Sequence, residues 1–341
     1  MQPIGQATPH LLRRHVESLA HGPRGRRHAP HAMAAAEAYV TEALRAAGWQ
    51  VFREPFDVPV RVGSTDRPGT RATPLKVRLH RGLSGANLRA ELPGADLPAS
   101  TGGPPPPTLV VGAHLDTVVD SPGADDNASG VAVVLEVARL LGALPVPPPV
   151  TLLVFDMEEL GLIGSREAVR RLLGERRALG GMICLESVGY FSTEPDSQRL
   201  PSGARLAMPE AVKAVRRSGG RGDFTLIVHR ASSRALADTW SAAAAAASPV
   251  LPTVRLRDPR PDGRLGALLG LALPALGNLD RSDHAPFWNH RVPALMLTNT
   301  ANFRNDRYHR AGDTPDTLDY ERLASVATAT ATTAAAWPRG G

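Results

Sequence analysis

Four segments of this 341-residue chain place side chains that can bind a metal directly after apolar stretches. His114-Leu115-Asp116 follows one apolar run, and Asp156-Met157-Glu158-Glu159 follows the next. Glu186 ends a third run, and Tyr308-His309 comes shortly after a fourth. Imidazole and carboxylate groups without a thiolate favour zinc, and they also suit cobalt or manganese. The residue types therefore indicate hydrolytic metal chemistry.

A fifth acidic segment, GADDNASG at 123–130, precedes an apolar helical stretch. Each motif alone fits a structural role, because Asp-Asp often caps a helix and Glu-Glu often lies on a solvated face. The motifs together do not fit structural roles, because consecutive carboxylates directly after an apolar strand are half-buried. Burying such charges without a cation costs roughly several kcal/mol each. Two imidazoles and three carboxylates would balance two divalent cations and one hydroxide, which suits a two-metal site with a bridging carboxylate.

The elements that must position these side chains alternate between strand and helix from residue 108 onward. A helix over 131–144 is apolar on almost every face, so we expect it to be buried against a sheet. Near-continuous apolar strands alternating with helices predict an α/β fold, with a largely parallel sheet covered on both faces. Ligands of such sheets bind beyond the carboxyl ends of the strands, where the motifs stand. The predicted strands are 108–113, 150–155, 182–185, 223–229, 250–256 and 293–298.

The remaining segments are expected to complete one domain over 1–341. The Pro-rich stretch 93–107 is predicted to be a loop, and 191–206 and 257–282 are predicted to be surface loops that wall a cleft. The other predicted helices are 9–22, 30–47, one from about 165, 231–247 and 319–336, and the other predicted strands are 49–56, 75–81 and 86–92.

The charge and composition exclude several classes of protein. The net charge is +6, but the arginines are scattered and aromatic residues are only 4%, which argues against a nucleic-acid partner. No run of about 18 apolar residues exists, so no membrane association is expected. The first residues lack the apolar region of a secretion signal, which predicts a cytoplasmic protein. The single cysteine, Cys184, is expected to be a small buried residue.

The motifs HLD, GADDNASG, EELG, SDHAPF and YHRAGDTPDTLDY, in this order, resemble the co-catalytic zinc exopeptidase family. That family includes bacterial leucyl aminopeptidase, aminopeptidase Y, glutamate carboxypeptidase II and glutaminyl cyclase. The resemblance implies a three-layer α/β/α zinc-exopeptidase fold with a mixed, largely parallel central sheet. It also implies two zinc ions, a peptide substrate and hydrolysis of a terminal peptide bond.

The resemblance further implies a metal-binding role for five residues. His114 and Glu159 correspond to terminal ligands, one on each metal, and Asp126 corresponds to the bridging carboxylate. Glu186 and His309 correspond to the remaining ligands.

Other residues are implied to act beside the ligands. Glu158 corresponds to the general base, and Asp116 to the partner that fixes the tautomer of His114. Tyr308 is expected either to hydrogen-bond the oxyanion or to pack over the metal loop. A cis peptide is expected before the bridging residue, at Asp125–Asp126. His284 is expected to make a buried hydrogen bond at a helix start rather than to bind metal.

The favoured function is an aminopeptidase, with several alternatives. Many aminopeptidases of this family carry Asp where this chain has Glu186, whereas Glu is common in carboxypeptidase- and deacylase-like relatives. A carboxypeptidase or amidohydrolase on the same site therefore stays open, as does a glutaminyl cyclase-like acyltransferase with one zinc. A binding module that has lost its ligands is disfavoured, because all five ligand positions are filled. No pattern in the sequence indicates an oligomeric state or a preferred side chain.

Overall fold

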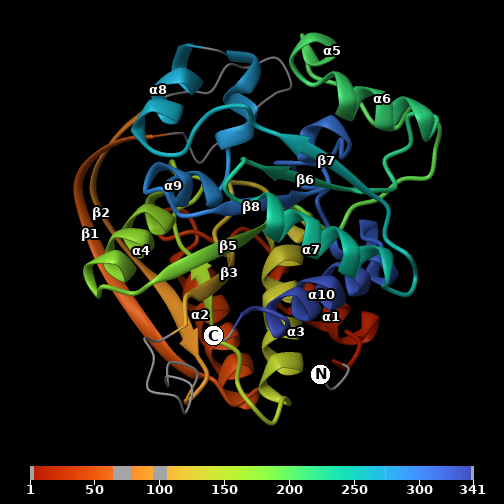
Figure 1. Ribbon diagram of the computed structural model, residues 1–341. Coiled ribbons are helices and arrows are strands. Elements are labelled where there is room, and N and C mark those ends of the chain that lie inside the picture. The colour runs from red at the N-terminus through yellow and green to blue at the C-terminus, as the bar shows by residue number, and fades with distance from the viewer. Residues whose placement is uncertain (1–3, 64–77, 95–105, 273, 339–341) are drawn as a thin grey trace.

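The computed structural model describes residues 4–63, 78–94, 106–272 and 274–338 (Figure 1). The strands are β1 (Gln50–Gly63), β2 (Arg78–Glu91), β3 (Thr108–His114), β4 (Val150–Phe155), β5 (Leu179–Glu186), β6 (Thr225–His229), β7 (Thr253–Arg257) and β8 (Ala294–Thr298). They form one sheet in the order β1-β2-β4-β3-β5-β8-β6-β7. The central strands β4, β3, β5 and β8 are parallel, whereas β2 is antiparallel to β4, and β6 to β8. The sheet is therefore mixed and mostly parallel, as predicted.

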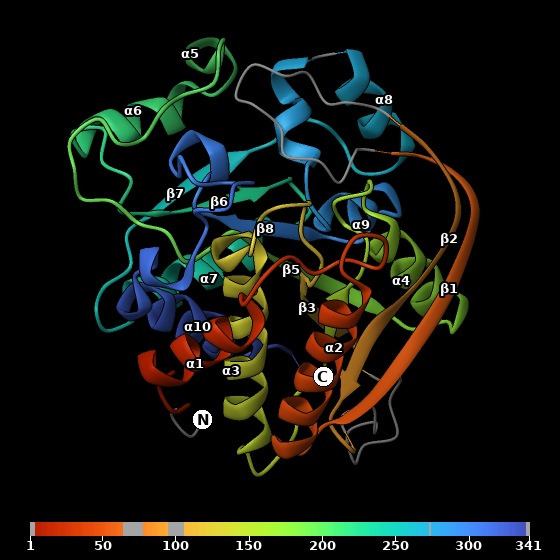
Figure 2. The same cartoon turned by 180° about the vertical axis from the view of Figure 1, so that it is seen from behind.

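Helices cover both faces of this sheet because neighbouring strand residues point to opposite sides. Leu109 and Val111 of β3 join one apolar core, and Val110 between them joins the other. The first core is covered by α1 (Pro9–Leu19), α2 (Pro30–Ala46), α3 (Gly130–Gly142), α7 (Arg234–Ala245) and α10 (Tyr320–Ala335). The second is covered by α4 (Ile163–Gly174) and α9 (His284–Asn289). Figure 2 shows α1, α2 and α3 on the near side of the sheet, which confirms the three-layer arrangement.

Short helices and turns complete the chain between these layers. They are η1 (Ala124–Ser129), α5 (Ala204–Ala207), α6 (Pro209–Arg217), α8 (Arg264–Ala272), η2 (Pro274–Asp280), η3 (Ala301–Phe303) and η4 (Pro315–Thr317). The segment 257–282, predicted to be a loop, thus contains α8 and η2, and α5 begins within 191–206. Of the predicted loop 93–107, residues 95–105 lie outside the described residues.

The antiparallel ribbon of β1 and β2 differs from the prediction of two short strands at 75–81 and 86–92. A single strand, β2, spans Arg78–Glu91, and residues 75–77 lie outside the described part of the chain. Gly85, which falls between the two predicted strands, lies within β2 against β1. A Cβ atom there would stand 2.6 Å from the Phe56 ring and 2.8 Å from the Asp156 carboxylate. The glycine therefore permits close packing of the ribbon rather than ending a strand.

Among the described residues, no helix has the length and apolar character needed to cross a lipid bilayer.

Candidate metal centre

The five expected ligands meet at the carboxyl ends of the parallel strands. His114 is the last residue of β3 and Glu186 the last residue of β5, while Glu159 lies in the turn after β4. Asp126 lies in η1, immediately before the buried helix α3, and His309 lies in the loop after β8. Residues nearly 200 positions apart in sequence therefore share one site because parallel strands end at the same edge.

The two carboxylate oxygens of Asp126 face two separate groups. Oδ1 lies 3.2 Å from His114 Nε2, and that nitrogen is 3.4 Å from Oε2 of Glu186. Oδ2 lies 2.9 Å from His309 Nε2, which is 3.3 Å from Oε1 of Glu159. We call these the His114 half-site and the His309 half-site. The arrangement makes Asp126 a natural bridge between two cations.

The donor atoms fit divalent cations. Both Asp126 oxygens and the Nε2 atoms of His114 and His309 are buried and have no hydrogen-bond partner within the described part of the chain. Burial alone would lower the pKa of His309, but the carboxylates of Glu159 and Asp126 raise it to about 10. Buried carboxylates thus surround each imidazole, and a metal at each half-site would balance their charge.

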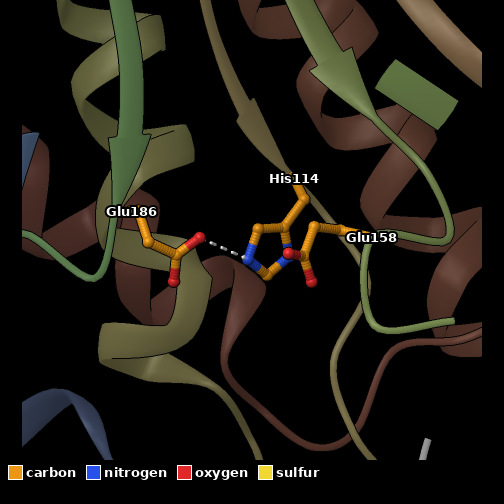
Figure 3. A group of neighbouring side chains, drawn as sticks. All are labelled: His114, Glu158 and Glu186. Carbon is orange, nitrogen blue, oxygen red and sulfur yellow. Dashed lines mark ion pairs between the residues drawn. The ribbon is translucent and has the colours of Figure 1, made fainter. Parts of the chain in front are cut away.

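Glu158 lies beside the His114 half-site. One of its oxygens is within 4.8 Å of ligand atoms of His114 and Glu186, and Figure 3 shows its carboxylate next to the His114 ring. Only 8% of Glu158 is exposed. Burial raises the pKa of its carboxyl group well above the ordinary value, although His114 opposes this shift. A carboxylate with a raised pKa is suited to accept and return a proton near neutral pH.

Asp116 orders both half-sites with different atoms. Its main-chain oxygen lies 3.0 Å from His114 Nδ1, whereas its carboxylate is 3.8 Å from that nitrogen. The carboxylate instead accepts the amide protons of Glu158 and Glu159, at 3.0 and 3.1 Å. Because Nδ1 of His114 donates to the carbonyl, Nε2 is left with the lone pair that a metal needs.

The Asp125–Asp126 segment is held by hydrogen bonds to side chains for which the sequence predicted no role. Asp313 accepts the amide protons of Asp125 and Asp126 at 2.9 and 3.1 Å. The Asp125 carboxylate accepts from the side chains of Asn299 and Asn305 and from the amides of Gly189 and Tyr190. Asp313 lies in the motif YHRAGDTPDTLDY, which carried no predicted role for it, and the two asparagines lie in loops with no distinguishing pattern.

The cis peptide of this segment is one residue later than expected. The Asp126–Asn127 bond is cis, so the expectation of a cis bond at Asp125–Asp126 is wrong. The bond therefore follows the bridging residue instead of preceding it.

Several ligand-bearing turns have unusual backbone conformations. Met157, directly before Glu158, has φ of 56°, and Ser187, directly after Glu186, has φ of 49°. His309 itself has φ of 59°. Residues other than glycine seldom adopt this left-handed backbone conformation. They keep it where surrounding contacts fix the backbone, as happens at functional sites.

Glu186 is fixed by two hydroxyl groups. Ser282 Oγ donates to Oε2 at 2.7 Å, and Ser187 Oγ donates to Oε1 at 3.1 Å. His284, two residues after Ser282, is fully buried and bonds the Leu279 carbonyl at 2.7 Å through Nε2. His284 therefore makes the buried hydrogen bond predicted at the start of α9.

Tyr308 packs over the loop that carries His309. The two rings are stacked with their centroids 3.9 Å apart. Burial raises the pKa of the Tyr308 hydroxyl well above its ordinary value, with a further contribution from Asp126. The hydroxyl therefore stays protonated and can donate a hydrogen bond at neutral pH.

A cavity of about 120 Å³ adjoins the metal centre, with Glu186 and Tyr308 in its lining. Most of the other lining residues are apolar and come from α5, α6 and strands β6, β7 and β8. Segments 191–206 and 257–282 both contribute to this lining. Phe303 lines this cavity, whereas Phe287 and Trp288 of α9 lie in the apolar core. Tyr190 packs against the core on the other face of the sheet.

The sequence profile of peptidase family M28 matches residues 95–253 and 273–334. This chain belongs to peptidase family M28. Among curated M28-like relatives, YfbL of Escherichia coli is 34% identical over 231 residues, which cover 64% of this chain and 64% of YfbL. The "Probable lipoprotein aminopeptidase LpqL" of Mycobacterium tuberculosis is 40% identical over 121 residues, 32% of this chain and 24% of LpqL. The chain thus spans less than two thirds of these relatives.

Solved structures share the fold of this M28 chain. A zinc aminopeptidase from Bacillus subtilis superposes with a TM-score of 0.65 at 15% identity, over 96% of this chain and 94% of that one. A glutaminyl cyclase from Porphyromonas gingivalis superposes with a TM-score of 0.59 at 19% identity, over 95% and 96%. The zinc-exopeptidase architecture predicted from the motifs is therefore confirmed.

Proposed function

We propose that the chain is a zinc-dependent aminopeptidase that removes N-terminal residues from peptides. The observation that carries the proposal is the buried carboxylate of Glu158, beside two half-sites that share Asp126. Family membership and the aminopeptidase names of relatives support the same reaction. We further propose that residues 1–341 act as one catalytic domain, without a nucleic-acid or membrane partner, in the cytoplasm.

Two zinc ions would be held by the residues of the two half-sites. His114, Glu186 and one oxygen of Asp126 would hold the first. His309, Glu159 and the other oxygen of Asp126 would hold the second. Cations bound there would lower the pKa of a water molecule and polarise the substrate carbonyl.

The remaining chemistry falls to side chains of the chain itself. Glu158 accepts the proton of the attacking water and returns it to the nitrogen of the leaving peptide. The Tyr308 hydroxyl donates a hydrogen bond to the carbonyl oxygen as negative charge develops on it. The cavity beside Glu186 receives the side chain of the residue being removed.

A peptide library read by mass spectrometry tests the proposal. The zinc-loaded protein is incubated with peptides whose amino and carboxyl ends are free or blocked, and metal is counted in the same preparation. We expect two zinc ions per chain and loss of residues from free N-termini only. Shortening of N-acetylated peptides from the other end would instead establish a carboxypeptidase. Loss of ammonia from N-terminal glutamine, with one zinc per chain, would establish a glutaminyl cyclase.

A further inference from the structure

One exposed cation lines the cavity beside the metal centre. Among the described lining residues, only Glu186 and Arg281 carry charged side chains. Within the described part of the chain, Arg281 makes one long hydrogen bond, 3.5 Å from Nη1 to the side-chain oxygen of Asn278. No ion pair of Arg281 occurs within the described ranges, whereas Arg230 and Arg260 both pair with Asp258. Its guanidinium is therefore available to a molecule that enters the cavity.

The backbone of Arg281 is anchored on both sides. Asp280 before it pairs with Arg260 and with Arg230, and both arginines are almost completely buried. Ser282 after it donates to Glu186 at 2.7 Å. The position of Arg281 is thus tied directly to a residue of the His114 half-site. This anchoring limits the cost of ordering the side chain when it binds a ligand.

We propose that Arg281 binds a carboxylate of the substrate and thereby gives the enzyme a preference for peptides that carry one close to the scissile bond. A guanidinium presents parallel N–H donors that match a carboxylate, and no other cation lines this cavity within the described residues. The carboxylate belongs either to the C-terminus of a dipeptide or to an acidic side chain. This inference rests on the proposed aminopeptidase function.

Two pairs of peptides test the proposal and separate the two sources. Leu-Leu is compared with Leu-Leu-amide for the terminal carboxylate, and Glu-Leu-amide with Gln-Leu-amide for the side chain that enters the cavity. We expect kcat/KM to be roughly 5- to 30-fold higher for the carboxylate-bearing member of at least one pair, as for a hydrogen-bonded charge at a partly exposed site. The preference should shrink as salt is added.

Variants of Arg281 assign the preference to its side chain. R281Q should bring the ratio within the affected pair close to one, and R281K should retain part of it, because Lys keeps the charge but not the fork of donors. Arg264→Gln, on the exposed surface of α8 and outside the cavity lining, is the matched control and should keep the full ratio. Calorimetric binding of the same peptides to the zinc-loaded Glu158→Gln variant gives the ratio without turnover.

The outcomes are distinct for the two proposals. Hydrolysis of all four peptides without a carboxylate preference, or with one that R281Q leaves intact, overturns the role of Arg281 and leaves the aminopeptidase standing. No hydrolysis of any of them by the zinc-loaded wild-type protein overturns both.

Discussion

The metal centre and the cavity wall next to it are built in opposite ways. The metal centre lies at the carboxyl ends of the parallel strands, and the backbone amides of its ligand-bearing segments are fixed by hydrogen bonds to the buried carboxylates of Asp116 and Asp313. Beside strands β6, β7 and β8, the wall includes the short helices α5 and α6, which are held by apolar contacts, and Leu206 of α5 is 91% exposed. The difference indicates that the ligand positions are fixed by the sheet, whereas the helical part of the wall can change without disturbing them.

The largest expected effect is on the metal centre itself. Glu158→Gln should keep both metals but lower kcat roughly 100- to 10,000-fold, because the amide cannot accept the proton of water. Turnover and metal content are measured on the same sample. Glu42→Gln, on the exposed face of α2, is the control and should behave as wild type. Full activity in the Glu158 variant would remove it as the base.

A smaller effect, on metal affinity, is expected at Asp313, which supports the ligand Asp126 without binding metal itself. Asp313→Asn replaces one of the two acceptors that hold the amides of Asp125 and Asp126 with a donor, so the bridging carboxylate should shift. We expect metal affinity to fall about 10- to 100-fold, measured by competition with a chelator. The exposed neighbour Asp316 provides the control as Asp316→Asn. Unchanged affinity would show that this support is dispensable.

A change in the wall should alter selectivity rather than chemistry. Ala211 of α6 lines the cavity, and Ala211→Phe would fill much of its 120 Å³. We expect the preference for Phe over Ala at the peptide N-terminus to fall roughly tenfold, in line with the typical discrimination of an apolar pocket. The ratio of the two kcat/KM values is the measurement, with exposed Ala235→Phe as the control. An unaltered ratio would place the substrate side chain elsewhere.

The smallest effect on the reaction is expected far from both regions, at His15. Burial lowers the pKa of His15 from 6.5 to about 4, and Arg14 and Arg139 act in the same direction, against Glu136. The unfolded chain therefore binds a proton that the folded chain excludes. The stabilising contribution is present above pH 6.5 and is lost as the pH falls toward 4.

Denaturant unfolding at several pH values measures this contribution. Wild type should lose roughly 2 kcal/mol between pH 7 and pH 5 through this group. His15→Gln should flatten that part of the profile, while exposed His10→Gln should leave it in place. Turnover at pH 7 is expected to be equal in all three proteins. A profile that is identical for wild type and His15→Gln would contradict the assignment.

The strands and the gathering of polar residues at their carboxyl ends could be predicted from the sequence because one physical signal covers both, whereas the individual ligand roles came from the resemblance. Buried parallel strands are apolar throughout, so a polar residue such as His114 or Glu186 at the end of one stands out. The turn after β4 could be predicted for the same reason, since Asp156 and the two glutamates at 158 and 159 follow the six uncharged residues of the strand.

Other features depend on contacts between distant segments and leave no local pattern. Asp116 was expected to fix the tautomer of His114, and its main-chain carbonyl contacts that ring, while its carboxylate accepts the amide protons of Glu158 and Glu159. That partner is set by how β3 and β4 align, which spacing alone does not reveal. Helix α8 was missed because its sequence, RLGALLGLA, contains two glycines and leaves Leu265 and Leu268 exposed.

The double attachment of Asp116 has a mechanical consequence. Its carbonyl accepts a hydrogen bond from the His114 ring, and its carboxylate accepts the amide protons of Glu158, beside the same half-site, and of Glu159 in the His309 half-site. A shift of this one residue would therefore move backbone or side-chain groups of both half-sites at once. The loop after β3 thus couples the two half-sites mechanically, in addition to the Asp126 carboxylate that lies between them.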